Sequence, residues 1–164
     1  MRALQPLALA EFDAAPFRYV ASGYIAGSPR AVFDELGDPS KWFPMMTRCV
    51  WTTAETGGVG AEREVTVRVF GKFHARMLVW EPEHRVAFTM IGTTSRLVAQ
   101  MAEDLRLTPD GDGVRLDWIV AARLTVLGRA TPGLRLILGR MFAGLRRNLE
   151  TRVSNADARG REVS

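Results

Sequence analysis

The chain has 164 residues, 47% of them hydrophobic, which is enough for one domain with a substantial buried core. The formal net charge is +4 and the pI is near 10.0, but the cations are almost all arginine and are scattered among carboxylates. No segment interleaves aromatic and basic residues as single-strand binders do, so the composition argues against a nucleic-acid partner.

Cysteine and histidine usage argues against a metal site. Cys49 is the single cysteine, so neither an intramolecular disulfide nor a cysteine-based metal site is possible. The histidines, His74 and His84, lack ligand spacing, and we expect no metal and no cofactor. No stretch approaches the roughly 18 apolar residues of a membrane span. We therefore expect a cytoplasmic protein without stable membrane insertion.

The first strand is predicted over residues 17–26, FRYVASGYIA, because β-branched and aromatic residues favour a pleated, half-buried segment. Gly23 has no side chain, so the pattern leaves open which face of this strand points inward. We expect residues 1–16, ahead of the strand, to be a loosely held lead-in.

Two short helices are predicted after the first strand. Ser28 is a typical N-cap, and Pro29 suits the first helical position, where an N–H group would have no partner. We expect Gly37 to end this helix and residues 38–43 to form a second helical turn.

Six further strands are predicted from the alternation of apolar and polar residues, which has the period of a strand. Their expected ranges are 48–55, 61–70, 72–81, 85–92, 97–108 and 114–125. In the second of these, Val65, Val67 and Val69 share the inward side, and Gly71 is expected to reverse the chain. Consecutive hairpins of this kind require an antiparallel sheet.

A long amphipathic helix is predicted over residues 131–153, with Thr131 as N-cap and Pro132 at the first helical position. At 100° per residue its large apolar side chains fall in one arc: Leu134, Ile137, Leu138, Met141, Phe142, Leu145 and Leu149. Burying such a stripe contributes roughly 10–20 kcal/mol before entropy is subtracted, so the helix must cover a sheet. We expect residues 154–164, which are polar, to form a flexible tail.

This element order, with the segments SPRAVFDELGDPSKWFP, GGVGAEREV, VWEPEHRVAF and LTPDGDGVRLDW, resembles the polyketide cyclase/dehydrase and lipid-transport family of the SRPBCC, or START-like, superfamily. The resemblance covers residues 17–153 and rests on turns and helix caps. It implies an α+β helix-grip fold within a single domain of residues 1–164. In that fold a seven-stranded curved antiparallel sheet wraps around the C-terminal helix and leaves an apolar cavity.

The inward strand faces are rich in methionine and aromatic residues. Such residues are usually plain core, but seven strands present more inward surface than one helix fills, and methionine adapts to irregular space. In the family, the segment with Trp42 and Phe43 borders the cavity mouth, where it either gates the cavity or simply packs under the short helices. The residues expected to bind a ligand are Trp42, Phe43, Met46, Val67, Phe73, Met77, Phe88, Met90, Met101, Trp118, Val120, Leu134, Leu138, Met141 and Phe142.

Glu103 is the candidate catalytic residue. It shares its strand parity with Met101 and Leu105, so it is expected to point inward, where apolar surroundings would disfavour the charged carboxylate. Such a group can act as acid, base or ligand anchor. The alternative is that a bulge turns it outward or that an arginine pairs with it.

Three functions are compatible with this pattern. The first is binding or transport of a hydrophobic small molecule of lipid, polyketide or isoprenoid type in the internal cavity. The second is a polyketide aromatase/cyclase-type enzyme that uses the same cavity, with Glu103 in proton transfer. The third is a protein-interaction or co-chaperone-like module, which an exposed apolar patch away from the cavity would favour. The chain is also compatible with a homodimer.

Overall fold

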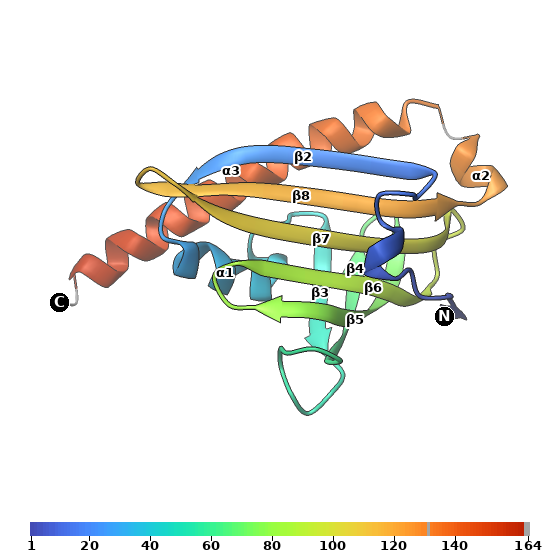
Figure 1. Ribbon diagram of the computed structural model, residues 1–164, viewed down its shortest axis with the longest axis horizontal. Helices are drawn as coiled ribbons and strands as arrows, with labels where there is room; N and C mark the ends of the chain where they lie inside the picture. The colour runs from blue at the N-terminus through green and yellow to red at the C-terminus, as the bar shows by residue number, and fades with distance from the viewer. Residues whose placement is uncertain (131, 163–164) are drawn as a thin grey trace.

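One antiparallel sheet forms the main layer of the protein in the computed structural model (Figure 1). The structure describes the backbone of residues 1–130 and 132–162, and it leaves the side chains of residue 135 and residues 156–162 undescribed. Thr131, the expected N-cap of the long helix, lies outside the described residues. The expected fold is confirmed: the sheet is curved and antiparallel, and a long C-terminal helix lies along it.

The sheet contains the seven predicted strands in the order β2-β8-β7-β6-β5-β4-β3, and a two-residue strand β1 pairs with β6. The first predicted strand therefore lies beside the last one, and the predicted hairpins follow across the sheet. The strands are β1 (Arg2–Ala3), β2 (Phe17–Ala26), β3 (Met46–Trp51), β4 (Glu62–Val67), β5 (Gly71–Glu81), β6 (Arg85–Thr93), β7 (Val98–Asp110) and β8 (Gly113–Leu124).

The first of the two short helices after β2 begins and ends as its sequence signals predict, and the second is shorter than the predicted turn over residues 38–43. They are α1 (Pro29–Gly37) and the 3-10 turn η2 (Pro39–Lys41). The Ser28 hydroxyl accepts a hydrogen bond from the Ala31 amide at 3.1 Å, which caps α1 with Pro29 in the first turn.

The N-terminal segment is packed against the sheet, so the prediction of a loosely held lead-in is wrong. Strand β1 pairs with β6, and the segment also contains a 3-10 turn, η1 (Leu9–Glu11). Leu7 and Phe12 are buried against Ala102 and Ala121 in a second, smaller hydrophobic cluster. Covering these apolar groups is the physical reason why this segment is held down.

The hairpin between β4 and β5 turns earlier than predicted. Val67 pairs with Gly71, so residues 68–70 form a three-residue loop. Val69 has a φ of 71° and is 92% exposed, and its predicted inward position is therefore wrong. A hairpin loop of this length needs a residue in the left-handed region, and that requirement overrides the alternation of the strand.

The long helix α3 (Leu134–Glu162) follows a short helix, α2 (Val126–Arg129). It begins later than predicted, because Pro132 lies in a turn and Gly133 takes a φ of 68°. It also continues to Glu162, so the predicted end at Val153 and the start of a tail at residue 154 are wrong.

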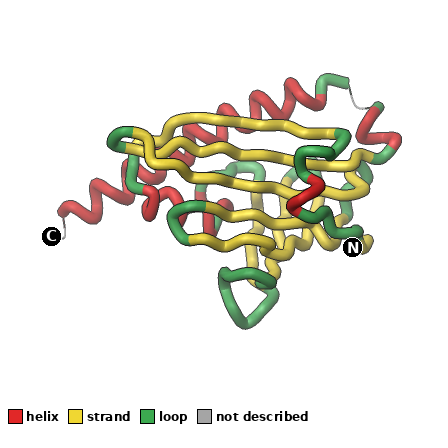
Figure 2. The backbone as a smooth tube through the Cα atoms, viewed as in Figure 1, coloured by secondary structure: helices red, strands yellow, loops and turns green. Residues whose placement is uncertain are grey.

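Only part of the predicted apolar arc of α3 is buried. The residues of the helix that are fully covered lie in its middle and C-terminal part, namely Phe142, Leu145, Leu149 and Val153. Ile137, expected in the buried arc, is 49% exposed, and Leu138 is half-buried. Figure 2 shows α3 running obliquely along the sheet, where it packs on β2 and α1. The N-terminal part of α3 is thus the more loosely packed one.

Candidate functional site

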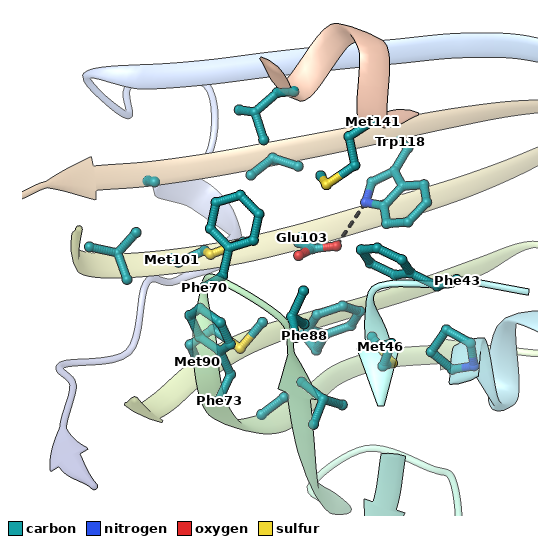
Figure 3. A pocket seen from close by; sticks show the side chains of 18 of the residues that line it. Phe43, Met46, Phe70, Phe73, Phe88, Met90, Met101, Glu103, Trp118 and Met141 are labelled. Carbon is teal, nitrogen blue, oxygen red and sulfur yellow. Dashed lines mark hydrogen bonds between the residues drawn. The ribbon is translucent and has the colours of Figure 1, made fainter. Parts of the chain in front are cut away.

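An apolar cavity lies between the sheet, the η2 segment and the N-terminal half of α3 (Figure 3). Its volume is about 150 Å³. All the apolar residues expected at a ligand site border this cavity, with Met77 as the exception. They are Trp42, Phe43, Met46, Val67, Phe73, Phe88, Met90, Met101, Trp118, Val120, Leu134, Leu138, Met141 and Phe142. That these side chains bind a ligand stays a prediction.

Met77 is buried in the core and does not border the cavity, so its expected place is wrong. Its amide donates to the Ala61 carbonyl at 2.9 Å, and its carbonyl accepts from the Gly60 amide at 2.9 Å. The pairing of β5 with β6 also shifts between Met77 and Val79. Residues 60–61 therefore pair edge to edge with this part of β5, and the Met77 side chain is buried in the main core cluster instead of bordering the cavity.

Several residues that line the cavity were not among the ligand-binding residues expected from the sequence. The strand parity that identified Val67 also places Arg63, Val65 and Ala75 inward, so the alternation carried a usable signal for them. Phe70 lies in the hairpin turn and Ser95 lies between strands, where no such signal exists. The full set that was missed is Phe17, Leu36, Pro39, Arg63, Val65, Phe70, Ala75, Val86, Ser95, Leu97, Val98, Leu105, Ala122 and Leu124.

Glu103 borders the cavity from β7, as its parity predicted. Its Oε2 accepts a hydrogen bond of 2.8 Å from the Trp118 indole Nε1 on β8. Trp118 pairs with Leu105 across the two strands, so the contact with Glu103 is a diagonal one that a long aromatic side chain can span. In Figure 3 the carboxylate points into the space between Phe43 and Met141.

Burial raises the pKa of Glu103 to about 7, although the Trp118 hydrogen bond and the Arg63 charge both act to lower it. An apolar environment disfavours the charged carboxylate more than these two contacts favour it. Near neutral pH the group therefore exists in both its protonated and its ionised form.

An aromatic wall holds Trp118 in place. Its ring makes edge contacts with Phe142 at 4.7 Å and with Trp42 at 6.1 Å between centroids. The Trp42 Nε1 donates to the Glu35 carbonyl at 2.7 Å, and the Trp42 side chain is buried. Of the two alternatives for the Trp42 segment, this packing favours a fixed wall over a mobile gate.

Arg63 is the cation of the cavity lining and is only 4% exposed. Its guanidinium carbon lies 4.9 Å from the Phe88 ring centroid and 5.6 Å from that of Trp51. Ala75, opposite Arg63 on β5, carries only a methyl group, which leaves room for the guanidinium to reach Phe88 on β6. A permanently charged group therefore lies between aromatic faces inside the molecule.

A surface groove adjoins the cavity at the start of α3. Pro16, Arg123, Gly128, Arg129 and Gly133 line it, and it shares Phe17, Leu124 and Leu134 with the cavity. Large apolar residues on α2 and the first turns of α3 are exposed nearby without lining the groove: Val126, Leu127, Leu136 and Ile137. The loosely packed end of the helix thus coincides with an apolar, arginine-bordered surface.

Among the side chains that the structure describes, no three His, Cys, Asp or Glu residues gather as a metal-binding group. Across the described helices, none is both long and apolar enough to cross a membrane.

The curved sheet, the helix along it and the apolar cavity between them define a helix-grip protein. The chain belongs to the polyketide cyclase/dehydrase and lipid transport family, whose sequence model matches residues 16–154. An uncharacterized protein of Mycobacterium tuberculosis is 31% identical over 152 residues, which cover 88% of this chain and 91% of that protein.

Solved structures share the fold at low sequence identity. A START superfamily protein from Mycobacterium smegmatis superposes with a TM-score of 0.70 at 14% identity, covering 85% of this chain and 98% of that one. The crystal structure of Ara h 8.0201 gives a TM-score of 0.67 at 13% identity, with coverages of 85% and 98%. At such identities the likeness extends to the fold alone.

Proposed function

We propose that this protein binds and carries a hydrophobic small molecule of lipid, polyketide or isoprenoid type inside the cavity between the sheet and α3. The observation that carries the proposal is the cavity itself, whose lining is almost wholly apolar apart from Arg63, Glu103 and Ser95. Ligand sites of proteins have this composition, with few polar groups that orient the ligand.

The size of the cavity indicates how a ligand fits. A dry apolar cavity of about 150 Å³ is large enough for a single benzene-sized ring. A longer chain needs more room, which the flexible side chains of Met46, Met101 and Met141 can supply by changing rotamer. The half-buried start of α3 can also shift at low cost, because it covers little apolar surface.

The groove at the start of α3 is the proposed mouth. It shares three residues with the cavity, and the side chains around it are apolar or arginine. A hydrophobic ligand would then enter between β8 and the first turn of α3, at Leu124 and Leu134.

A pair of variants on opposite faces of α3 tests this function. Leu138→Trp adds bulk inside the cavity, whereas Leu136→Trp adds the same bulk at a position that is 60% exposed. With the neutral dye Nile red, the fluorescence titration should give at least tenfold weaker binding for Leu138→Trp and unchanged binding for Leu136→Trp. Native mass spectrometry after incubation with a lipid extract should reveal bound mass in the same order. Equal binding by both variants, or none by the wild type, would refute the proposal.

A cyclase-type enzyme is the second candidate, and the pKa of Glu103 favours it. A general acid or base works best when its pKa lies near the working pH, and burial raises that of Glu103 to about 7 inside the cavity. With a poly-β-ketone substrate, Glu103→Gln should keep binding and lose at least a hundredfold in turnover. Unchanged turnover by Glu103→Gln would remove Glu103 from the mechanism.

A further inference from the structure

The charged groups that line the cavity indicate what kind of head group the ligand has, which the apolar lining does not. Arg63 is buried, yet its Nε has no hydrogen-bond partner among the described residues. Its Nη1 reaches the Gly37 carbonyl only at 3.4 Å, the long end of the hydrogen-bond range, and its other contact is the Cys49 thiol on β3.

No carboxylate of the described residues forms an ion pair with Arg63. The charges of Glu103 and Asp38 act on it from a longer distance, and burial lowers the pKa of its guanidinium. Aromatic contacts with Phe88 and Trp51 offset only part of the cost of burying the cation. Leaving a buried charge without a hydrogen-bonded counter-ion is strongly unfavourable, so a folded protein keeps such an arrangement where something else completes it.

Glu103 does not provide the hydrogen-bonded counter-ion of Arg63. Its Oε2 is engaged by Trp118, and at neutral pH part of the population is protonated, since burial raises its pKa to about 7. Phe88 lies directly opposite Glu103 in the β6–β7 pairing, and the Arg63 guanidinium stacks on that same Phe88 ring. The cation and the carboxyl group thus lie near one another at the cavity wall, without direct contact.

We propose that Arg63 anchors the head group of the ligand, which is a hydrophobic molecule carrying one carboxylate, with its oxygens bound beside the guanidinium and its apolar part in the Met- and aromatic-lined space. This inference rests on the proposed function and names the ligand class of the same cavity. A carboxylate matches the planar fork of an arginine and forms short, charge-assisted hydrogen bonds with it. A neutral lipid would leave the cation unpaired.

The test compares matched acids and primary amides, which differ in charge and little in shape. Three pairs of increasing size are used: 4-butylbenzoic acid, decanoic acid and oleic acid, each with its amide. Displacement of Nile red from the wild-type protein should give at least one acid that binds tenfold or more tightly than its amide at pH 6, where Glu103 is mostly protonated. A hydrogen-bonded charge pair inside a protein produces preferences of that size.

Variants of two arginines test whether Arg63 causes the preference for the acid. Arg63 lies on β4, and Arg68 lies in the turn that follows β4. Arg63→Met should abolish the preference for the acid and leave the amide affinity within about twofold. Arg68→Met, at an exposed position next to β4, removes the same charge outside the cavity and should change neither. If Arg63→Met fails to fold, Arg63→Lys provides the test: the acid preference should persist in weakened form, because lysine lacks the planar fork.

The possible outcomes distinguish the assignment of the acidic head group from the proposed carrier function. If acid and amide bind equally well in the wild type, or if Arg63→Met retains the preference, the acidic head group is refuted while the carrier function stands. If neither the dye nor any acid or amide binds, the proposed function fails together with it.

Discussion

The indole N–H of Trp118 donates to the Glu103 carboxylate across 2.8 Å, and both side chains face the cavity from adjacent strands. This hydrogen bond favours the ionised carboxylate, whereas burial disfavours it more strongly. The protonation of Glu103 is therefore set by two opposing effects that can be altered separately.

Trp118→Phe removes the hydrogen bond and keeps most of the ring packing against Phe142. The pKa of Glu103 should rise by about 1 unit or more above its value of about 7, because a hydrogen bond to a charged acceptor contributes about 1.5–3 kcal/mol. Carboxyl-carbon NMR titration of selectively labelled protein measures this directly. Trp42→Phe, which leaves the Trp118 hydrogen bond in place, is the control. A fall in the pKa of Glu103 in Trp118→Phe would contradict the assigned role of the indole.

The raised pKa of Glu103 predicts a pH dependence of stability. The folded state holds the proton up to about pH 7, whereas the unfolded chain releases it near 4.5. Stability from this group is therefore fully present below about pH 4.5 and is lost as the pH rises to about 7, by roughly 3 kcal/mol. Urea unfolding at pH 5 and pH 8 should give a smaller difference in Glu103→Gln than in the wild type. An identical difference in both proteins would rule out Glu103 as the cause.

Binding of a hydrophobic acid should also depend on Glu103. A carboxylate beside Arg63 repels an ionised Glu103, so binding favours the protonated form and the affinity for oleic acid should fall as the pH rises from 6 to 8. The other charged or titratable groups around Arg63 are the Cys49 thiol on β3 and Asp38 before η2, and burial raises the pKa of that thiol. In Glu103→Gln the affinity should be nearly flat over this range. A slope that survives in Glu103→Gln would assign the titration to another group.

The two ends of α3 should respond differently to truncation. Leu149 is fully buried, so Leu149→Ala should lower the free energy of unfolding by about 2–5 kcal/mol. Leu138 already borders empty space, so Leu138→Ala should cost less than about half as much while enlarging the cavity. Chemical denaturation of the two variants checks this contrast. Equal losses would mean that the start of α3 is as tightly packed as its C-terminal part.

Replacing glycine with alanine should have opposite effects on stability at two positions. A Cβ on Gly128 in α2 would overlap the carbonyl oxygen of Leu97, so Gly128→Ala should destabilise the fold by about 1–3 kcal/mol. Around Gly144, in α3, a Cβ would meet no atom within 4 Å, so Gly144→Ala should stabilise by about 0.5–1 kcal/mol. Thermal unfolding of both variants measures the difference. A stabilised Gly128→Ala would refute the close approach of α2 to Leu97.

Much of the architecture was predictable because it depends on local chemistry. Alternation and turn residues predicted the seven long strands and the hairpins between consecutive strands, and Ser28 with Pro29 predicted the start of α1. The same period of two gave the inward face of β7, and with it the position of Glu103 on the cavity wall. Each of these features is decided by neighbouring residues in the chain.

Other features depend on partners that are distant in sequence. The N-terminal segment has no strong periodic pattern, and it is held down because Leu7 and Phe12 cover the outer-face residues Ala102 on β7 and Ala121 on β8. Ile137 belongs to the apolar arc by its angle, yet it is 49% exposed in the folded protein. Met77 has inward parity, but its side chain packs in the main core cluster and does not reach the cavity.

The sequence by itself determined the curved antiparallel sheet, the long helix and the inward carboxyl group, since period, caps and turns are properties of short segments. Only the tertiary structure decided which inward side chains enclose empty space and that Arg63 lies buried there, with no carboxylate of the described residues bonded to it. Empty space and unpaired charge are relations between several strands and a helix, and no single segment contains them.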